Sequence, residues 1–150
     1  MPDSTIPNHV RDRALQWPMV EPSVLAWLRT WTLKPVYTRE PTKYPEDGFY
    51  QVTATGGPGS TGQLGIERAF SVEVDSVHTQ LGEMWALAGE ASTAMLALGG
   101  NGLHVASPIG PFYVDSCEET FAPAREDPPP TPGFARGTAT YQLVLRPRHQ

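Results

Sequence analysis

The pattern of apolar and polar residues is clearest in residues 69–100, where its period changes once. In the first part apolar and polar side chains alternate, which is typical of a half-buried β-strand. The apolar members of this strand are Phe70, Val72 and Val74. From about Thr79 the apolar residues recur every three or four positions and predict an amphipathic helix that ends at Gly99-Gly100. The apolar face of this helix is Leu81, Met84, Ala88, Ala91, Met95 and Leu98.

A second helix and several shorter strands are expected elsewhere in the chain. Residues 21–32 have helical spacing, with Pro22 at the first helical position. Its apolar residues are Val24, Leu25, Leu28 and Trp31. Strands are expected at residues 36–38, 49–55, 103–106, 111–121 and 138–146. In the strand at 111–121, simple alternation places Phe112, Val114 and Ser116 opposite Tyr113, Asp115 and Cys117.

Long loops rich in proline and glycine separate these elements. They cover residues 39–48, 56–65 and 122–137, and the last contains three consecutive prolines. The order of elements predicts an α+β fold with a mainly antiparallel sheet of about four to five strands, packed by two helices. We expect an N-terminal arm at residues 1–20 and a single α+β domain at residues 21–150, a size that suits one core.

Charge and cysteine content exclude several classes of function. A formal net charge of −5 argues against a dedicated nucleic-acid binder, which normally carries a basic face. The single cysteine, Cys117, allows no intramolecular disulfide, so a reducing compartment is expected. The N-terminal segment has no apolar core typical of a signal peptide, and no run of about 18 apolar residues predicts a membrane span.

Candidate sites for phosphate or metal are weak. Gly57 and Gly62 have the spacing of a phosphate-binding loop, but Gln63 and Leu64 stand where that motif has lysine and a hydroxyl residue. A plain loop is the better interpretation. The histidines show no spacing typical of metal ligands and are His9, His78, His104 and His149.

Candidate groups for catalysis also have simpler interpretations. Asp75 and His78 resemble an acid–base pair, but Asp75 or Ser76 more simply caps the following helix and His78 lies on its surface. Glu118 and Glu119 are expected to raise the pKa of Cys117, so a packed side chain is favoured over a nucleophile. We therefore expect no enzyme, no cofactor and no metal.

The remaining features indicate contacts with other proteins. The chain has four tryptophans, Trp17, Trp27, Trp31 and Trp85, and this residue type is enriched at protein contacts. For Trp27 the sequence leaves a surface contact and a place in the core equally open. The three long loops are longer than neutral connectors in a compact domain and are expected to reach neighbouring subunits.

In the order of its elements and the residue character of several stretches, the chain resembles the tail terminator proteins of long-tailed, siphovirus-like phages, the minor tail or tail-completion family. The resemblance covers residues 21–148. Its stretches are VEPSVLAWLRTW, FYQVTATGG, FSVEVDSV, LGEMWALAGEASTAMLAL, GPFYVDS and TYQLVLRPR, the last after Arg136.

This resemblance implies a structural virion protein that is assembled in the host cytoplasm and lies at the head–tail junction. It implies a homohexameric ring that caps the tail tube at its head-proximal end and stops tube polymerisation. The implied partners are the major tail tube protein, the head-side stopper or connector, and genomic DNA that passes through the lumen unread, without a membrane. Six copies would carry a charge of about −30, which would repel DNA.

Three other functions remain open at this point: a head-completion or stopper protein, a small ligand-binding accessory protein, and a standalone host protein of regulatory type. For contact residues the loops are the favoured source, with Arg136 either pairing across a subunit boundary or lying on the surface as a plain arginine. The candidate interface residues are Arg39, Tyr44, Glu46, Asp47, Arg125, Glu126, Asp127, Phe134 and Arg136.

Overall fold

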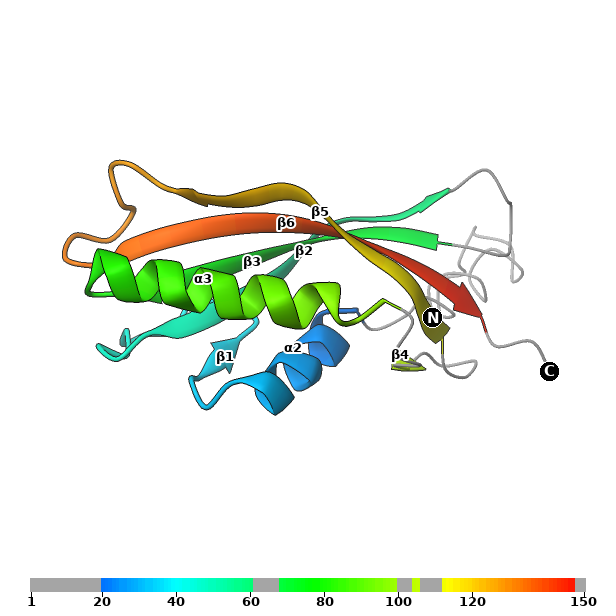
Figure 1. Cartoon of the computed structure of the whole chain (residues 1–150), viewed down its shortest axis with the longest axis horizontal. Coiled ribbons are helices and arrows are strands. Elements are labelled where there is room, and N and C mark those ends of the chain that lie inside the picture. The colour runs from blue at the N-terminus through cyan, green and yellow to red at the C-terminus, as the bar shows by residue number, and fades with distance from the viewer. Residues whose placement is uncertain (1–19, 61–67, 100–103, 106–111, 148–150) are drawn as a thin grey trace, which may run out of the picture.

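The computed structural model describes residues 20–60, 68–99, 104–105 and 112–147, which form one sheet covered by two helices (Figure 1). The helices are α2 (Val20–Trp31) and α3 (Leu81–Leu96). The strands are β1 (Val36–Tyr37), β2 (Phe49–Ser60), β3 (Arg68–His78), β4 (His104–Val105), β5 (Phe112–Arg125) and β6 (Ala135–Pro147). The expected arm lies outside the described residues, apart from Val20 at the start of α2.

The sheet confirms the predicted α+β class. Its strand order is β1-β2-β3-β6-β5-β4, and among the strands that the structure describes only β1 and β2 pair in parallel. Four long strands make up most of the sheet, and β1 and β4, with two residues each, bring the described total to six. Residues far apart in the chain become neighbours because β3 pairs with β6 along its whole length.

Both helices bury their apolar stripes against the same face of the sheet. Val24 and Leu28 of α2 and Met84 and Met95 of α3 are buried, as their helical spacing predicts. Trp27 packs partly against this core, and its indole Nε1 donates to the backbone oxygen of Ala94 over 2.7 Å. Of the two interpretations of Trp27, the core is therefore correct. Neither helix is long and apolar enough to cross a membrane.

The buried stripe of α3 is rotated from the predicted one. Leu87 and Ala94 are buried, whereas Leu81, which was expected in the core, is 39% exposed. The reason is that α2 packs along the Ala94 side of α3, which pulls that side inward and leaves the Leu81 side open. Trp31, at the end of α2, is likewise 41% exposed and not a core residue.

Two strands run further than the hydrophobic pattern indicates. β2 continues to Ser60, so the first part of the predicted glycine loop is strand, and residues 61–65 lie outside the described part. β5 continues to Arg125, which shortens the proline-rich loop to residues 126–134. Irregular register in both strands, with Gly56 at one of these positions, lets them extend beyond a regular ladder.

A register shift in β5 overturns the predicted alternation. The pairing with β6 slips between Val114 and Ser116, and both Val114 and Cys117 are buried, with Cys117 paired to core residue Leu143. One extra residue at a bulge moves every following side chain to the opposite face. The prediction that Val114 and Cys117 lie on opposite faces is therefore wrong.

Candidate functional site

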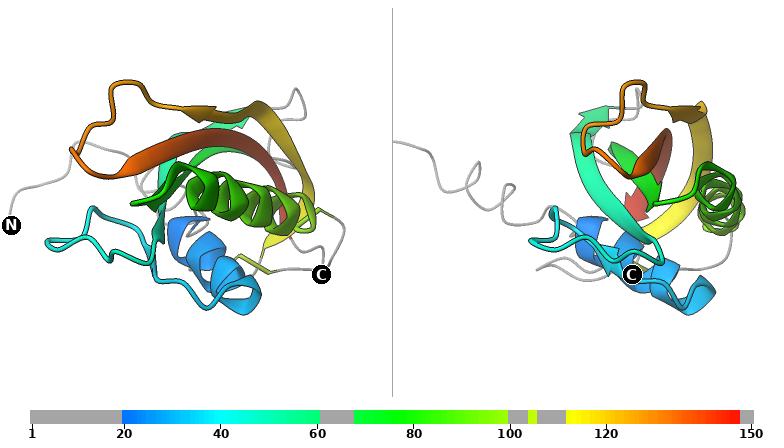
Figure 2. Two further views of the ribbon diagram at one scale, coloured as in Figure 1. Left: turned by 60° about the vertical axis from the view of Figure 1, so that its left-hand side comes forward. Right: turned by 90° about the vertical axis from the view of Figure 1, so that its left-hand side faces the viewer.

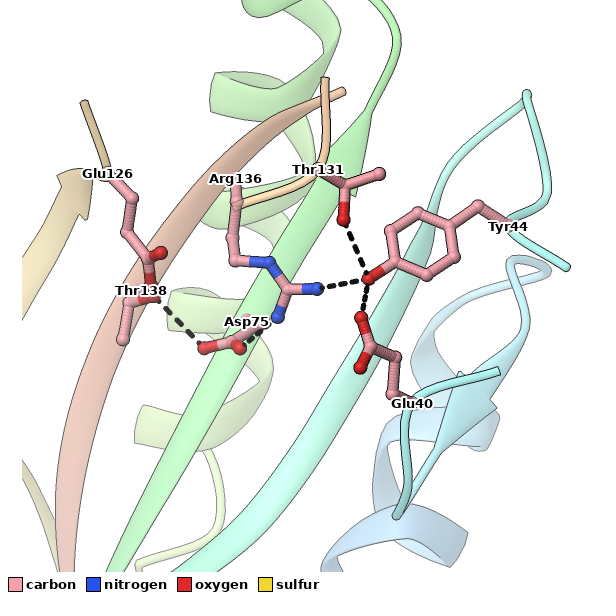
Figure 3. A network of polar contacts seen from close by, with 7 residues as sticks. All are labelled: Glu40, Tyr44, Asp75, Glu126, Thr131, Arg136 and Thr138. Carbon is pink, nitrogen blue, oxygen red and sulfur yellow. Dashed lines mark hydrogen bonds and ion pairs between the residues drawn. The ribbon is translucent and has the colours of Figure 1, made fainter. Parts of the chain in front are cut away.

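A cluster of polar side chains lies on the face of the sheet opposite the helices, at the end where β2 begins (Figure 3). Val77 of β3 pairs with Arg136 of β6, and Asp75 pairs with Thr138. Residues two apart on a strand share a face, so all four side chains point the same way. Phe49 pairs with Val77 on this face and is fully buried there.

The centre of the cluster is an ion pair between Arg136 and Asp75. Arg136 Nη1 lies 2.5 Å from Asp75 Oδ2, and each residue is 8% exposed. The Thr138 hydroxyl lies 3.0 Å from Asp75 Oδ1 and 2.8 Å from Glu126 Oε1, and its one hydrogen can serve one carboxylate at a time. Burial raises the pKa of Asp75, against the opposing effect of Arg136.

Negative charge accumulates around this pair. Burial raises the pKa of Glu73, and the charges of Asp75 and Glu126 raise it further, while Arg136 acts in the opposite direction. Arg136 is therefore the positive charge that opposes the rise in pKa of both Asp75 and Glu73.

Tyr44 joins the loop at residues 38–48 to this ion pair. Its hydroxyl accepts from Arg136 Nη2 at 3.1 Å and from Thr131 Oγ1 at 3.2 Å, and it donates to Glu40. Its ring meets Phe134 edge-on, with centroids 5.1 Å apart. The loops at residues 38–48 and 126–134 are thereby fastened to each other and to the sheet.

Two backbone contacts complete this junction. The Glu126 amide donates to the Arg136 carbonyl over 2.9 Å, and the Phe134 amide donates to the Thr131 carbonyl over 3.2 Å. The ring of Tyr44 also packs on that of Phe49, with centroids 5.0 Å apart. The cluster thus fastens the two loops to the sheet around one buried ion pair.

The structure brings together four of the nine candidate interface residues: Tyr44, Glu126, Phe134 and Arg136. Arg136 is buried, so its interpretation as a plain surface arginine is wrong, and its guanidinium is engaged within the chain. The other five are exposed on the same two loops or at their ends: Arg39, Glu46, Asp47, Arg125 and Asp127.

Sequence reasoning missed the residues that complete the cluster, which are Glu40, Asp75, Thr131 and Thr138. Asp75 was interpreted as a helix cap, but it lies within β3, and α3 follows Gln80 without a side-chain cap. The only signal for Asp75 was its place in an alternating strand. Its partner is 61 positions away along the chain, and nothing local to either residue indicates the pairing.

The other candidate groups have structural roles. The Nδ1 atom of His78 accepts from the Gln80 amide over 2.9 Å, in the turn before α3. Burial raises the pKa of Cys117 to about 12, with smaller contributions from Glu118 and Glu119. The thiol is buried, so the prediction of a packed side chain is confirmed. Across the part of the chain that the structure describes, no group of three or more His, Cys, Asp or Glu side chains is arranged to hold a metal.

Comparison with known proteins gives structural similarity without sequence similarity. No protein-family model and no curated protein sequence matches the chain. A chain from the virion of a native gene transfer agent particle is similar with a TM-score of 0.59 and 10% identity, over 85% of this chain and 95% of that one. A second solved structure, whose name states no function, is similar with a TM-score of 0.52 and 16% identity, over 95% of this chain and 97% of that one. The chain thus shares its fold, over nearly its whole length, with a component of a gene transfer agent virion.

Proposed function

We propose that this chain is a structural protein of a phage-like virion and, within the virion, a tail terminator. In this role it forms a hexameric ring at the head-proximal end of the tail tube, stops tube growth and joins the tail to the head-side connector. The observation that carries the proposal is the shared fold with a gene transfer agent virion chain, of which 95% is covered. The order of elements that resembles tail terminators is present in the described residues and supports the finer assignment.

Open strand edges support assembly into a ring. Among the described residues, β2 beyond Gln51 pairs only with β3, and β5 beyond Tyr113 pairs only with β6. Long open edges are liabilities unless another chain covers them. The two edges belong to different strands, so contacts between them are heterologous, and such contacts close into rings when the rotation permits.

The sheet face opposite the helices supports a role in which DNA passes without being bound. Its middle carries neutral polar side chains together with Glu73, and the neutral residues are Thr53, Ser71, Thr140 and Gln142. The exposed base Arg146 pairs with Asp115 over 3.2 Å. A neutral to acidic surface does not grip the phosphate backbone.

The polar cluster supports a role in contact and not in turnover. A buried, paired Arg–Asp centre fixes two loops, and the five exposed candidate residues lie on these loops or at their ends. Fixed loops present a defined surface to a partner. In the proposal these loops contact either the tube or the head-side connector.

The test is to measure assembly and its effect on tube growth. The purified chain is examined by light scattering and negative-stain electron microscopy, and it is then added to polymerising major tail tube protein from the same particle. A ring of six copies that limits tube length supports the proposal. A chain that stays monomeric at high concentration, or tubes whose length distribution does not change, contradicts the terminator role. Binding to the connector alone assigns the chain to the stopper class instead.

A further inference from the structure

One flank of α3 is apolar and uncovered. We call the residues Leu81, Trp85, Gly89 and Leu96 the α3 flank. Its three large side chains are between 39% and 48% exposed. A Cβ built on Gly89 meets no atom within 4 Å, and glycine inside a helix costs about 1 kcal/mol relative to alanine. Packing within the described chain gives no reason for this glycine.

The α3 flank lies beside the open edge of β5. Ser92, next to it on the helix surface, donates to Glu119 of β5 over 2.5 Å. The opposite side of α3 is occupied by α2, through the bond between Trp27 and Ala94. In the right-hand view of Figure 2, α3 lies next to β5 at one margin of the sheet, while β2 forms the other margin.

The opposite margin carries apolar side chains of its own. Trp31 at the end of α2 is 41% exposed, and Leu33, in the turn before β1, is fully exposed. We call residues 29–37 the α2–β1 corner. It lies on the same face of the sheet as α3, because α2 packs on β1 and β2.

The two margins have complementary charge. Between residues 114 and 124 there are three acidic residues and no basic one, and Glu118 is exposed there. The α2–β1 corner, residues 29–37, has two basic residues, Arg29 and Lys34, and no acidic one. Arg29 is exposed there, and its Nη2 donates to the Val36 carbonyl over 3.2 Å. Opposite charges on facing surfaces favour association and set its orientation.

The strand register also brings the margins to the same level. Across the four long strands, Thr53 of β2 lies in one row of paired residues with Glu73, Thr140 and Phe121. Ser60 of β2 lies in a second such row that ends at Val114 of β5. The stretches 53–60 and 114–121, which pair with no further strand among the described residues, thus lie level with each other across the sheet, and the Ala54 amide in the first donates to Glu21 Oε1 over 3.1 Å. The four long strands alternate in direction, so β2 of a neighbour placed beside β5 by rotation runs antiparallel to it.

We propose that the α3 flank is a docking surface for a second copy of this chain, and that it receives the α2–β1 corner of that copy. Trp31 and Leu33 of the neighbour then cover Trp85 and Leu81, and the basic corner lies against the acidic edge of β5. Gly89 leaves room for the neighbour's side chains. This inference rests on the proposed ring and adds the helix-layer contact that holds adjacent subunits together.

The first test introduces a long charged side chain on the flank. Gly89→Arg puts a positive charge where the basic corner docks, and it is compatible with the monomer because the site is open and arginine favours helix. Ala86→Arg is the matched control, on an exposed position about 100° around α3 from Trp85 and further from β5. We expect Gly89→Arg to raise the dissociation constant of the assembly about 30-fold or more, the effect of losing one hot-spot contact, and Ala86→Arg to leave it unchanged.

The second test shows whether the contact joins two different surfaces. Leu33→Glu places a negative charge in the corner, facing the acidic β5 edge, and is expected to give monomers by itself. A mixture of Leu33→Glu with Gly89→Arg is expected to associate in equal proportions, because one variant keeps its flank and the other its corner. If Leu33→Glu assembles normally, or if the mixture stays monomeric, the proposal is wrong. Circular dichroism and thermal melting confirm that each variant is folded.

These results separate the inference from the proposed function. If the unmodified chain forms rings that Gly89→Arg leaves intact, the docking surface is refuted and the terminator ring stands. If the unmodified chain forms open oligomers that both variants abolish, the docking surface stands and the terminator ring is refuted. A chain that is monomeric at every concentration refutes both.

Discussion

Replacing Arg136 by methionine tests whether the buried ion pair holds the polar cluster together. Methionine retains much of the aliphatic stem but removes the guanidinium, so Asp75 keeps only its bond with Thr138 and Tyr44 loses one donor. Asp75 is 8% exposed, and Glu126 adds to the unfavourable charge around it. The carboxylate must then stay charged in a poor environment or take up a proton.

The cost of protonation sets the scale of the effect. Removing one partner of a buried ion pair typically costs about 3–5 kcal/mol. Protonating a carboxyl of ordinary pKa costs about 4 kcal/mol at pH 7 and about 1.5 kcal/mol at pH 5, and this route limits the penalty. We therefore expect Arg136→Met to lose about 3–4 kcal/mol of unfolding free energy at pH 7 and about 1.5 kcal/mol at pH 5.

The pH dependence has a definite sign. Without Arg136, the pKa of Asp75 in the folded state lies further above its value in the unfolded chain. The folded variant then binds its proton more tightly than the unfolded chain, so its stability falls as pH rises between the two pKa values. The ion pair of the unmodified protein reduces this dependence.

Urea unfolding at pH 5, 6 and 7, followed by tryptophan fluorescence, measures the effect. Arg136→Lys is the first control, because it keeps a charge but loses the planar fork that reaches both Asp75 and Tyr44. The second is Arg136→Met combined with Asp75→Asn, which leaves no buried charge and should recover part of the loss. A loss below about 1 kcal/mol, or one that is the same at pH 5 and pH 7, would refute the reasoning.

Three further outcomes are expected. Burial raises the pKa of Cys117 to about 12, so iodoacetamide at pH 8 should modify the folded protein at least about 100-fold more slowly than the urea-unfolded chain; equal rates would contradict the packed thiol. Burial also raises the pKa of Glu73, so the folded state loses stability as pH rises above the range of an unfolded glutamate; Glu73→Gln should raise the melting temperature at pH 7 but not at pH 4, and the opposite order would contradict the sign. Gly48 has a φ of 96°, and a Cβ there would lie 2.8 Å from side-chain carbons of His78 and Leu87, so Gly48→Ala should cost about 2–3 kcal/mol of unfolding free energy in urea. Gly133→Ala should cost less, because its φ is also positive but its site is open; equal costs would show that His78 and Leu87 move aside without penalty.

The repeating pattern of apolar residues was enough to predict the class of fold and much of its core. Val72 and Val74 of β3 and Met84 and Met95 of α3 are buried as their spacing indicates. A segment that must bury one side repeats its apolar residues with the period of its own backbone, and this period can be read without knowledge of the partner. The packing of Cys117 was also predicted, from its acidic neighbours and not from the alternation of its strand, which placed it on the wrong face.

The tertiary structure alone decided which residues of the candidate site meet. Whether Cys117 lies on the Val114 face depends on a bulge against β6, and whether Asp75 is a cap or an ion-pair partner depends on the β3–β6 register that brings Arg136 beside it. The buried side of α3 was turned by the packing of α2. Local periodicity indicates how much of an element is buried, whereas strand register, bulges and helix contacts are set by the element that packs against it. Asp75 and Arg136 are 61 positions apart, so the sequence around either residue does not indicate the other.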